Sequence, residues 1–376
     1  MRKIAVEQPS VGDEELKYLT ECIRTGWISF RGPFVKQFES VVAQWCGARF
    51  GISTTSGTTA LHLALTALGI GEGDEVIVPS LTMIATANAV TYTRAKPIFA
   101  DSSEQTWNID PQAVRSLINE RTKAIIVVHL YGCPVDLAPI LQIATEYSLY
   151  VIEDAAGAFG AEYRGQKVGS IGDVGCFSFY ANKIITTGEG GMIVTHHENV
   201  AERAVAQRDH SYGEYEGQPR FLHFRLGYNY KMTNLQAAVG LAQMEKVETF
   251  IAKKREIASW YTKQLRDVDE LVLHPEIDYG KNVYSMYGVI LSESSQVSRD
   301  ELREELANRG IETRTFFVPL HEQPLYALLG NADCPTASRL AKNGIILPSG
   351  YQITHNDIEY ICSCTRALVS RRRRNA

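Results

Sequence analysis

Short apolar segments and amphipathic segments alternate along the first half of the chain, and this alternation is what most restricts its fold. The apolar segments read as strands because they are short, rich in β-branched residues and bounded by turn residues. They cover residues 50–53, 75–79, 97–100, 123–128, 149–152, 174–179 and 191–195. Helical periodicity fills intervals between them, at residues 58–68, 84–92, 111–118 and 137–146. This pattern predicts an α/β domain with a mostly parallel seven-stranded sheet and helices on both faces.

Two further segments near this domain have features of binding elements. Residues 13–22 and 34–45 show helical periodicity, and a loop between them carries Trp27 beside glycine and proline residues. That loop reads either as a binding lip or as a plain connector. Residues 207–230 are polar and aperiodic, and long ordered excursions of this kind tend to be functional or to reach a neighbouring subunit.

The C-terminal part predicts a second, smaller domain. A helical pattern runs over residues 234–264, and strand-like and helix-like segments are mixed beyond it. The strand-like segments are residues 284–291 and 313–317, and the helical ones are 299–309, 336–343 and 356–368. We therefore expect a large α/β domain over residues 1–245 and a small α+β domain over residues 246–376.

Composition excludes several classes of protein. The 376-residue chain has a formal net charge of -5, which gives no electrostatic reason to expect nucleic acid. Four arginines at 371–374 favour a solvated tail over a site for an anionic partner. The start lacks an apolar signal region and no apolar run is long enough to span a bilayer, so we expect a cytoplasmic protein. The seven cysteines lack disulfide-framework and CxxC spacing, and we expect them to be reduced.

The turn after the first strand has the features of an anion site. Ser56, Gly57 and Thr58 lie where a strand runs directly into an apolar helix. Free backbone N–H groups and the helix dipole favour an anion at such a turn, and the hydroxyl groups add donors. The alternative is that Ser56 or Thr58 only caps the helix. No lysine follows Gly57, so the turn is not a Walker loop.

A pair of acids ends another strand. Glu153 and Asp154 follow residues 149–152, and small residues that include Gly157 come next. An acid at the carboxyl end of a strand could bind a metal, act as a base or pair with a protonated heterocycle, and small neighbours would let a flat ring lie close to the backbone. The alternative is that Asp154 caps the following helix.

Lys183 lies between an aromatic strand-like run and a glycine-rich turn, within residues 177–192. Burial would lower the pKa of its amine and make it nucleophilic, so it is a candidate for imine chemistry; an exposed loop lysine is the alternative. The hydroxyl of Ser178 would face the same pocket if the chain turns between the two residues. Three strand ends thus carry the groups that a pyridoxal phosphate site needs. The anion site would bind its phosphate, Asp154 its pyridine nitrogen and Lys183 its aldehyde.

Two other cofactor classes find no support in the sequence. The glycines at 188, 190 and 191 precede a strand instead of joining a strand to a helix, so they do not match the dinucleotide fingerprint. No HExxH motif or clustered His/Cys spacing is present, so we expect no catalytic metal.

These motifs, in this order, resemble the DegT/DnrJ/EryC1/StrS family of pyridoxal-phosphate-dependent nucleotide-sugar aminotransferases, which have fold type I. The likeness runs from about Pro9 to Pro348. It is carried by residues 55–61, 73–80, 128–132, 153–156, 177–192 and 226–238. The resemblance implies that Lys183 bonds to the aldehyde of the cofactor and that Asp154 pairs with its pyridinium nitrogen.

The resemblance also implies a phosphate site and a partner subunit. Gly57, Thr58 and Ser178 match the family's phosphate-binding positions, and Ser56 lies beside them. Asn229 matches an asparagine that reaches the cofactor phosphate of the neighbouring subunit, which implies a homodimer with shared active sites.

Three positions depart from the family's usual residues, and they leave ring stacking and substrate contact open. Met83 stands where relatives usually have an aromatic ring stacked on the cofactor, and a thioether is a plausible substitute. Gly157 stands where relatives carry Gln, Glu or His. Lys231 replaces the usual arginine, which keeps the charge but loses the bidentate fork.

The residues of some motifs indicate a substrate class. Residues 229–234 look more like enzymes that aminate carbon 4 of a keto-sugar than like those that act at carbon 3. Residues 282–289 and 314–324 look similar to GDP-perosamine synthases, which implies a GDP-linked 4-keto-6-deoxy sugar, L-glutamate as amino donor and a role in polysaccharide or glycoconjugate biosynthesis. The alternative is a UDP- or dTDP-linked sugar aminated at carbon 4 or 3. The candidate substrate contacts are Trp27, Lys231, Arg314 and His321, with ordinary packing the alternative for Trp27 and His321.

Two other functions fit the motifs less well than transamination. Relatives that act as sugar dehydratases have the lysine replaced, commonly by histidine, so Lys183 argues against that activity. A regulator that binds the cofactor without turnover is disfavoured by the intact set of lysine, aspartate and phosphate-site residues. The sequence therefore predicts a transaminase with ping-pong kinetics.

Overall fold

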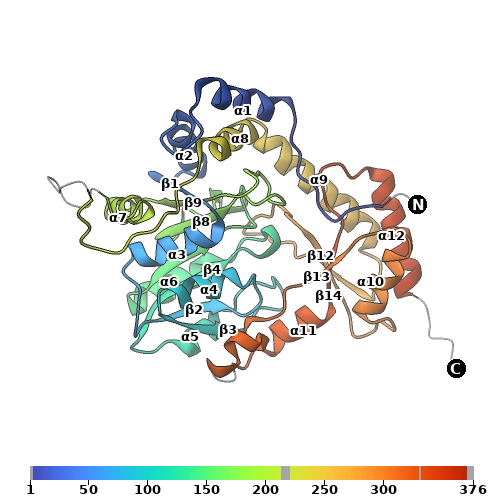
Figure 1. Ribbon diagram of the computed structural model, residues 1–376. Coiled ribbons are helices and arrows are strands. Elements are labelled where there is room, and N and C mark those ends of the chain that lie inside the picture. Colours follow the sequence, from blue (N-terminus) through green and yellow to red (C-terminus); the bar gives the residue numbers. More distant parts are fainter. Residues whose placement is uncertain (1–2, 213–220, 330–331, 371–376) are drawn as a thin grey trace.

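Figure 1 shows a computed structural model of the chain, which describes residues 3–212, 221–329 and 332–370. Its largest sheet has seven strands, and β9 runs antiparallel to both of its neighbours while the other adjacent pairs are parallel. The strand order is β1 (Phe50–Thr54), β9 (Gly191–Thr195), β8 (Val174–Ser178), β5 (Tyr150–Asp154), β4 (Thr122–Val128), β2 (Glu75–Pro79) and β3 (Lys96–Ala100). The predicted mostly parallel, seven-stranded sheet is confirmed.

Helices cover both faces of this sheet, and two apolar clusters lie between them and the strands. Side chains alternate along a strand, so Val76 and Val78 belong to one cluster and Ile77 to the other. The first cluster contains residues of α3 (Gly57–Ala67), α4 (Ala85–Tyr92), α7 (Glu198–Arg208) and α11 (Pro335–Asn343). The second contains residues of α2 (Pro33–Cys46), α5 (Pro111–Leu117), α6 (Leu137–Tyr147) and α8 (Asn234–Met244), and α1 (Asp13–Thr25) packs on α8.

The C-terminal segments form an antiparallel sheet with its own helices. Its strand order is β10 (Leu271–Leu273), β12 (Tyr287–Leu291), β14 (Gly344–Leu347) and β13 (Arg314–Thr315). A third apolar cluster joins this sheet to α9 (Val247–Leu265), α10 (Arg299–Ala307) and α12 (His355–Val369). The N-terminal segment also packs here, since Ile4 bridges to Ile311. The α+β character agrees with expectation, and the domain division at residue 245 stays a prediction.

Short elements connect these layers. A small sheet has the order β11 (Gly280–Lys281), β6 (Glu162–Tyr163) and β7 (Gln166–Lys167), so it pairs the C-terminal part with the segment after β5. Three 3₁₀ turns are η1 (Leu130–Gly132), η2 (Leu320–Glu322) and η3 (Pro324–Leu329).

Two details differ from the sequence-based expectation. The single helix expected over residues 234–264 is two helices, because α8 ends at Met244 and α9 begins at Val247. Two hydrogen bonds with α1 hold the break in place. Nζ of Lys246 donates to Glu15, and the Tyr18 hydroxyl donates to Glu245. Helix α7 was not anticipated, and its apolar contacts come mainly from small alanines, which give a weak periodic signal.

Some expectations concern residues that the structure does not describe, namely the arginines at 371–374 and part of the 207–230 excursion. Across residues 3–212, 221–329 and 332–370, no helix is long and apolar enough to cross a membrane. The same ranges hold no group of three or more His, Cys, Asp or Glu side chains that could bind a metal ion. All seven cysteines are free.

Candidate active site

The predicted anion turn and Ser178 meet at the carboxyl ends of β1 and β8. Helix α3 begins at Gly57, directly after β1, and a Cβ at Gly57 would lie only 2.8 Å from Cβ of Ser178. Only glycine fits this close approach, which leaves the N-terminal N–H groups of α3 beside the Ser178 hydroxyl. Ser56 caps the helix, since its Oγ accepts the N–H of Thr59 at 3.2 Å. The capping alternative therefore holds for Ser56 itself, and Thr58 lies in the first turn.

Asp154 ends β5 and is buried. Its Oδ2 accepts a hydrogen bond of 2.8 Å from the Thr86 hydroxyl, and its Oδ1 accepts the N–H of Ala156 at 3.2 Å. Burial raises the pKa of Asp154 by more than the Thr86 hydrogen bond and the nearby Lys183 charge lower it. The chain after Asp154 turns into β6, so the alternative that Asp154 caps a following helix is wrong. Asp154 is therefore a buried carboxyl with a raised pKa.

Lys183 lies on the turn after β8, and its side chain is partly buried. Burial lowers the pKa of the Lys183 amine, and the Asp154 charge offsets part of this effect. The turn is held through its backbone: Phe179 N–H donates to the carbonyl of Gly190 and the Thr187 N–H to the carbonyl of Phe179, each at 2.9 Å. Lys183 is therefore a partly buried amine within electrostatic range of Asp154, and its role stays a prediction.

The segment around Asn229 packs on α3 by alternate residues. The rings of Tyr228 and Tyr230 stack with centroids 4.8 Å apart, and the Tyr230 hydroxyl bonds Nδ1 of His62 on α3 at 3.0 Å. Because Tyr228 and Tyr230 face inward, the intervening Asn229 is exposed and points away from its own α3. The segment is fixed at Asp209, which forms a β-bridge with Asn229.

The Trp27 loop is anchored but its tip is open. Asn234, which is fully buried, donates from Nδ2 to the carbonyl of Trp27 at 2.7 Å and accepts the Phe34 N–H at 2.9 Å. The Trp27 side chain is 51% exposed, as is that of Met83 beyond β2. Arg314, on β13, is also exposed. These side chains are free to contact a ligand.

Two of the candidate substrate contacts have partners within the chain. Lys231 pairs with Asp209, and its Nζ lies 5.5 Å from the centre of the Phe30 ring. His321 Nδ1 bonds the hydroxyl of Ser80 at 2.6 Å, and its other ring nitrogen lies 3.3 Å from the Ser338 hydroxyl. For His321 the packing alternative is favoured by these contacts. Lys231 presents a neutralised pair instead of a free cation.

Gly157 borders the C-terminal part of the chain. A Cβ at this position would lie 3.6 Å from Oγ of Ser285 and 3.8 Å from the carbonyl oxygen of His129. Both are ordinary contacts, so a side chain would fit and its absence leaves space beside the Ser285 hydroxyl.

Comparison with known proteins decides the family. A sequence profile described as the DegT/DnrJ/EryC1/StrS aminotransferase family matches residues 9–366. The chain belongs to this family. It is therefore an aminotransferase that depends on pyridoxal phosphate, as expected from the resemblance.

Similar proteins cover nearly the whole chain. The protein is 44% identical to GDP-perosamine synthase of Caulobacter vibrioides over 96% of each chain. It is 43% identical to GDP-perosamine synthase of Escherichia coli O157:H7, over 98% of this chain and all of that one. The PLP form of the putative sugar aminotransferase Spr1654 from Streptococcus pneumoniae has a TM-score of 0.91, with 25% identity and 98% of both chains covered. These likenesses confirm the expected fold type.

The residues present fit pyridoxal phosphate. The glycine at 57 opens the start of α3 for a phosphate, and an amine with a lowered pKa, that of Lys183, lies near the buried Asp154. Among the residues that the structure describes, no cationic group contacts Asp154 directly, and its pKa is raised. Glu153 and His129 lie beside Asp154; the sequence alone indicates a structural role for His129, at the end of an apolar strand, and no specific role for Glu153. The acid pair at residues 153–154 was the available signal, but their contact spans 24 positions and is visible only in the fold.

Proposed function

We propose that the protein transfers an amino group from L-glutamate to carbon 4 of a GDP-linked 4-keto-6-deoxy sugar, as a GDP-perosamine synthase does. The observation that carries this proposal is 43–44% identity to two GDP-perosamine synthases over nearly the full length of both partners. The alternative within the family is a UDP- or dTDP-linked keto-sugar.

Each part of the site has an assigned task in this reaction. Pyridoxal phosphate supplies an aldehyde that bonds to amines and a protonated ring that accepts an electron pair. The N-terminus of α3 at Gly57 and Thr58, with the hydroxyl of Ser178, would hold the phosphate. Asp154 would hold the pyridine nitrogen, and Lys183 would bond to the aldehyde.

Lys183 also moves the protons. With glutamate bound, Nζ of Lys183 would take the proton from its α-carbon. Its lowered pKa favours the neutral amine that this step needs. In the second half-reaction the same group would deliver a proton to carbon 4 of the sugar. Burial raises the pKa of Asp154, and a pyridinium nitrogen beside it would offset the cost of burying its charge and keep it ionised.

The nucleotide preference is tested with a panel of substrates. GDP-, UDP- and dTDP-linked 4-keto-6-deoxy sugars are each incubated with the protein and L-glutamate, and products are identified by mass spectrometry. We expect kcat/KM for the GDP-linked sugar to exceed the others by about 100-fold, because a site built to hydrogen-bond one base leaves polar groups unpaired with another. Equal or higher kcat/KM with a UDP- or dTDP-linked sugar would reject the GDP assignment while leaving the chemistry intact.

A homodimer with shared sites is the second part of the proposal. It is supported by the outward direction of Asn229, which cannot turn toward α3 of its own chain while Tyr228 and Tyr230 pack there. In the dimer, Asn229 would donate its amide N–H to the cofactor phosphate of the partner.

Mixing two inactive variants tests this arrangement. Asn229→Asp places a carboxylate against the phosphate and Lys183→Ala removes the reactive amine, so each variant alone should be inactive. After unfolding and refolding together in equal amounts, about one quarter of wild-type activity should return, because half of the dimers are mixed and each carries one intact site. The control is the same mixture of folded proteins without exchange. Activity equal to the sum of the separate variants would contradict a shared site.

A further inference from the structure

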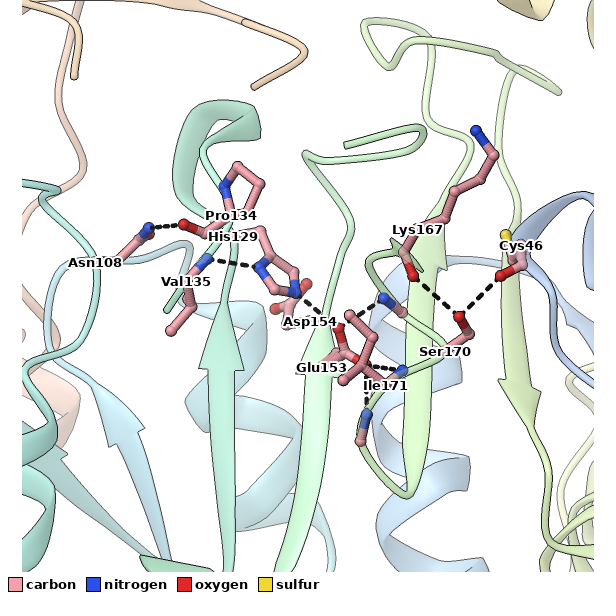
Figure 2. Close-up of polar contacts among 12 residues, drawn as sticks. Cys46, Asn108, His129, Pro134, Val135, Glu153, Asp154, Lys167, Ser170 and Ile171 are labelled. Carbon is pink, nitrogen blue, oxygen red and sulfur yellow. Dashed lines mark hydrogen bonds and ion pairs between the residues drawn. The ribbon is translucent and has the colours of Figure 1, made fainter. Parts of the chain in front are cut away.

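A buried carboxylate lies next to Asp154 in β5, and Figure 2 shows the contacts that hold it. Glu153 is 0% exposed. Its Oε1 accepts the backbone N–H groups of Ile171 and Gly172, and its Oε2 accepts that of Gly169, each at 2.7 Å. The fourth contact joins Oε2 to Nε2 of His129 at 3.0 Å. Each oxygen thus accepts two hydrogen bonds, as a buried carboxylate requires.

The hydrogen bonds fix the state of His129. Its Nδ1 accepts the N–H of Val135 at 3.0 Å, so that nitrogen carries no hydrogen. Nε2 therefore carries it and donates to Glu153, and the ring is neutral. Four donors point at the two oxygens of Glu153, so both oxygens act as acceptors and the carboxyl is ionised. Glu153 is an ionised group held by dipoles and a neutral ring.

His129 connects this carboxylate to the backbone of Asp154. The backbone N–H of His129 donates to the carbonyl of Asp154 at 3.2 Å, and its ring donates to the side chain of Glu153, the residue before Asp154. The peptide that carries Asp154 is thereby held from β4 on one side. On the other, Ala155 N–H donates to the carbonyl of Cys176 on β8 at 2.9 Å.

The ring of His129 also closes a strained turn. The bond to Val135 spans residues 129–135, where Tyr131 has φ 53° and Gly132 has φ 98°. This turn touches the C-terminal part of the chain, because the Val283 N–H donates to the Gly132 carbonyl at 3.2 Å. His129 thus has two separable contacts, one with Glu153 and one with the turn.

The Asp154 carboxyl itself has few restraints. Within the described chain its hydrogen bonds come from Thr86 and Ala156. Successive side chains of a strand point to opposite faces, so Glu153 and Asp154 share a peptide but not a pocket. A shift of the end of β5 would therefore move the carboxyl of Asp154 directly.

We propose that Glu153 and His129 are positioning residues, which fix the end of β5 so that the carboxyl of Asp154 meets the pyridine nitrogen of the cofactor. This inference rests on the proposed role of Asp154. Neither residue touches the cofactor, and both act through the backbone of Asp154.

Two substitutions of His129 separate its contacts. In His129→Gln the amide nitrogen takes the place of Nε2 and keeps the donor to Glu153, while the acceptor for Val135 is lost. In His129→Asn the amide oxygen takes the place of Nδ1 and keeps the acceptor, while the bond to Glu153 is lost. The pair is matched, since each variant keeps one of the two contacts.

Two measurements report on the pyridine nitrogen of the cofactor and on the order of β5. Holoenzyme reconstituted with ¹⁵N-pyridine-labelled pyridoxal phosphate reports the nitrogen's protonation by its chemical shift, and apoprotein hydrogen exchange reports the order of residues 150–157. We expect His129→Asn to shift the ¹⁵N signal toward the unprotonated value, to speed exchange at residues 150–157 and to lower kcat by about 10-fold, as is typical when an outer partner of a ligand is lost. His129→Gln should stay within about twofold of wild type in kcat, far inside that typical loss.

The outcomes separate a failure of the positioning inference from a failure of the proposed role of Asp154. Asp154→Asn should shift the ¹⁵N signal more than either His129 variant, and if it does not, the proposed role of Asp154 fails. If Asp154→Asn shifts the signal but His129→Asn leaves it at the wild-type position, the positioning inference is overturned. A larger effect in His129→Gln than in His129→Asn would also overturn it, in favour of turn closure. Should His129→Asn not fold, Glu153→Gln, which removes the charge at constant size, must show the same ¹⁵N shift.

Discussion

Replacing Lys183 by alanine is expected to abolish transamination while leaving the fold intact. Because we propose that the amine both bonds to the cofactor and moves the proton, we expect kcat to fall by about 10⁴-fold, the upper end of what a positioned proton-transfer group contributes. The fold should persist because the turn is held by backbone bonds among Phe179, Thr187 and Gly190 that do not involve the Lys183 side chain. Steady-state assays with glutamate and the keto-sugar measure the loss.

A small amine should restore part of this activity. Methylamine can occupy the space of the deleted side chain, and its neutral form, which increases with pH, is the active one. Rescue should therefore rise with pH in Lys183→Ala and be absent in wild type. The matched control is Lys123→Ala, an exposed lysine near the amino end of β4, which should retain full activity. Turnover of Lys183→Ala within tenfold of wild type would refute the assignment.

The sheet was predictable from the sequence because its signals are local. Each strand is an apolar run rich in β-branched residues, and buried parallel strands need no partner to show that pattern. Strand order and the reversed direction of β9 depend on pairing between distant segments. The break between α8 and α9 was missed for the same reason, since Glu15 and Tyr18 hold it from another helix.

The candidate site likewise has features that the sequence predicts and features that depend on the fold. Lys183, Asp154 and Gly57 could be proposed from the sequence because each lies at or shortly after the end of a strand and belongs to a contiguous motif. The engagement of Lys231 by Asp209 and of His321 by Ser80 could not be read from motifs, because these partners are 22 and 241 positions away. Contiguous motifs thus locate reactive groups, and only the fold shows which charges are already paired.

A buried ion pair joins the N-terminal segment to the rest of the molecule. Lys254 on α9 is 1% exposed, and its Nζ bonds to Glu7, to the carbonyl of Ser285 at 3.0 Å and to that of Ser349 at 2.8 Å. The Glu7 side chain is 2% exposed. Burial raises the pKa of Glu7 by more than Lys254 lowers it. Three separate segments therefore meet at one ammonium group, and one of them, at Ser285, borders Gly157 in the site.

Lys254→Met should destabilise the fold strongly at neutral pH. The substitution leaves Glu7 buried without a counter-ion and two carbonyls without a donor, so we expect the free energy of unfolding to fall by about 3–5 kcal/mol, measured by urea denaturation. An unpaired buried carboxyl has a folded pKa above its unfolded value, so its protonation favours the folded state. The deficit should therefore shrink as pH falls toward and below the ordinary value of 4.5.

Companion variants test whether the unpaired charge causes this loss. Glu7→Gln combined with Lys254→Met removes both charges and should recover part of the stability, because replacing a whole buried pair costs much less than breaking it. Lys253→Met, which breaks the more exposed pair with Glu256, should cost no more than about 1 kcal/mol. If Lys254→Met lost the same free energy at pH 4 as at pH 7, or if the double variant were as unstable as the single one, the loss would come from packing. A loss with the expected pH dependence would instead mean that the charge of Glu7, paired by Lys254, decides how firmly the N-terminal segment is held beside Ser285.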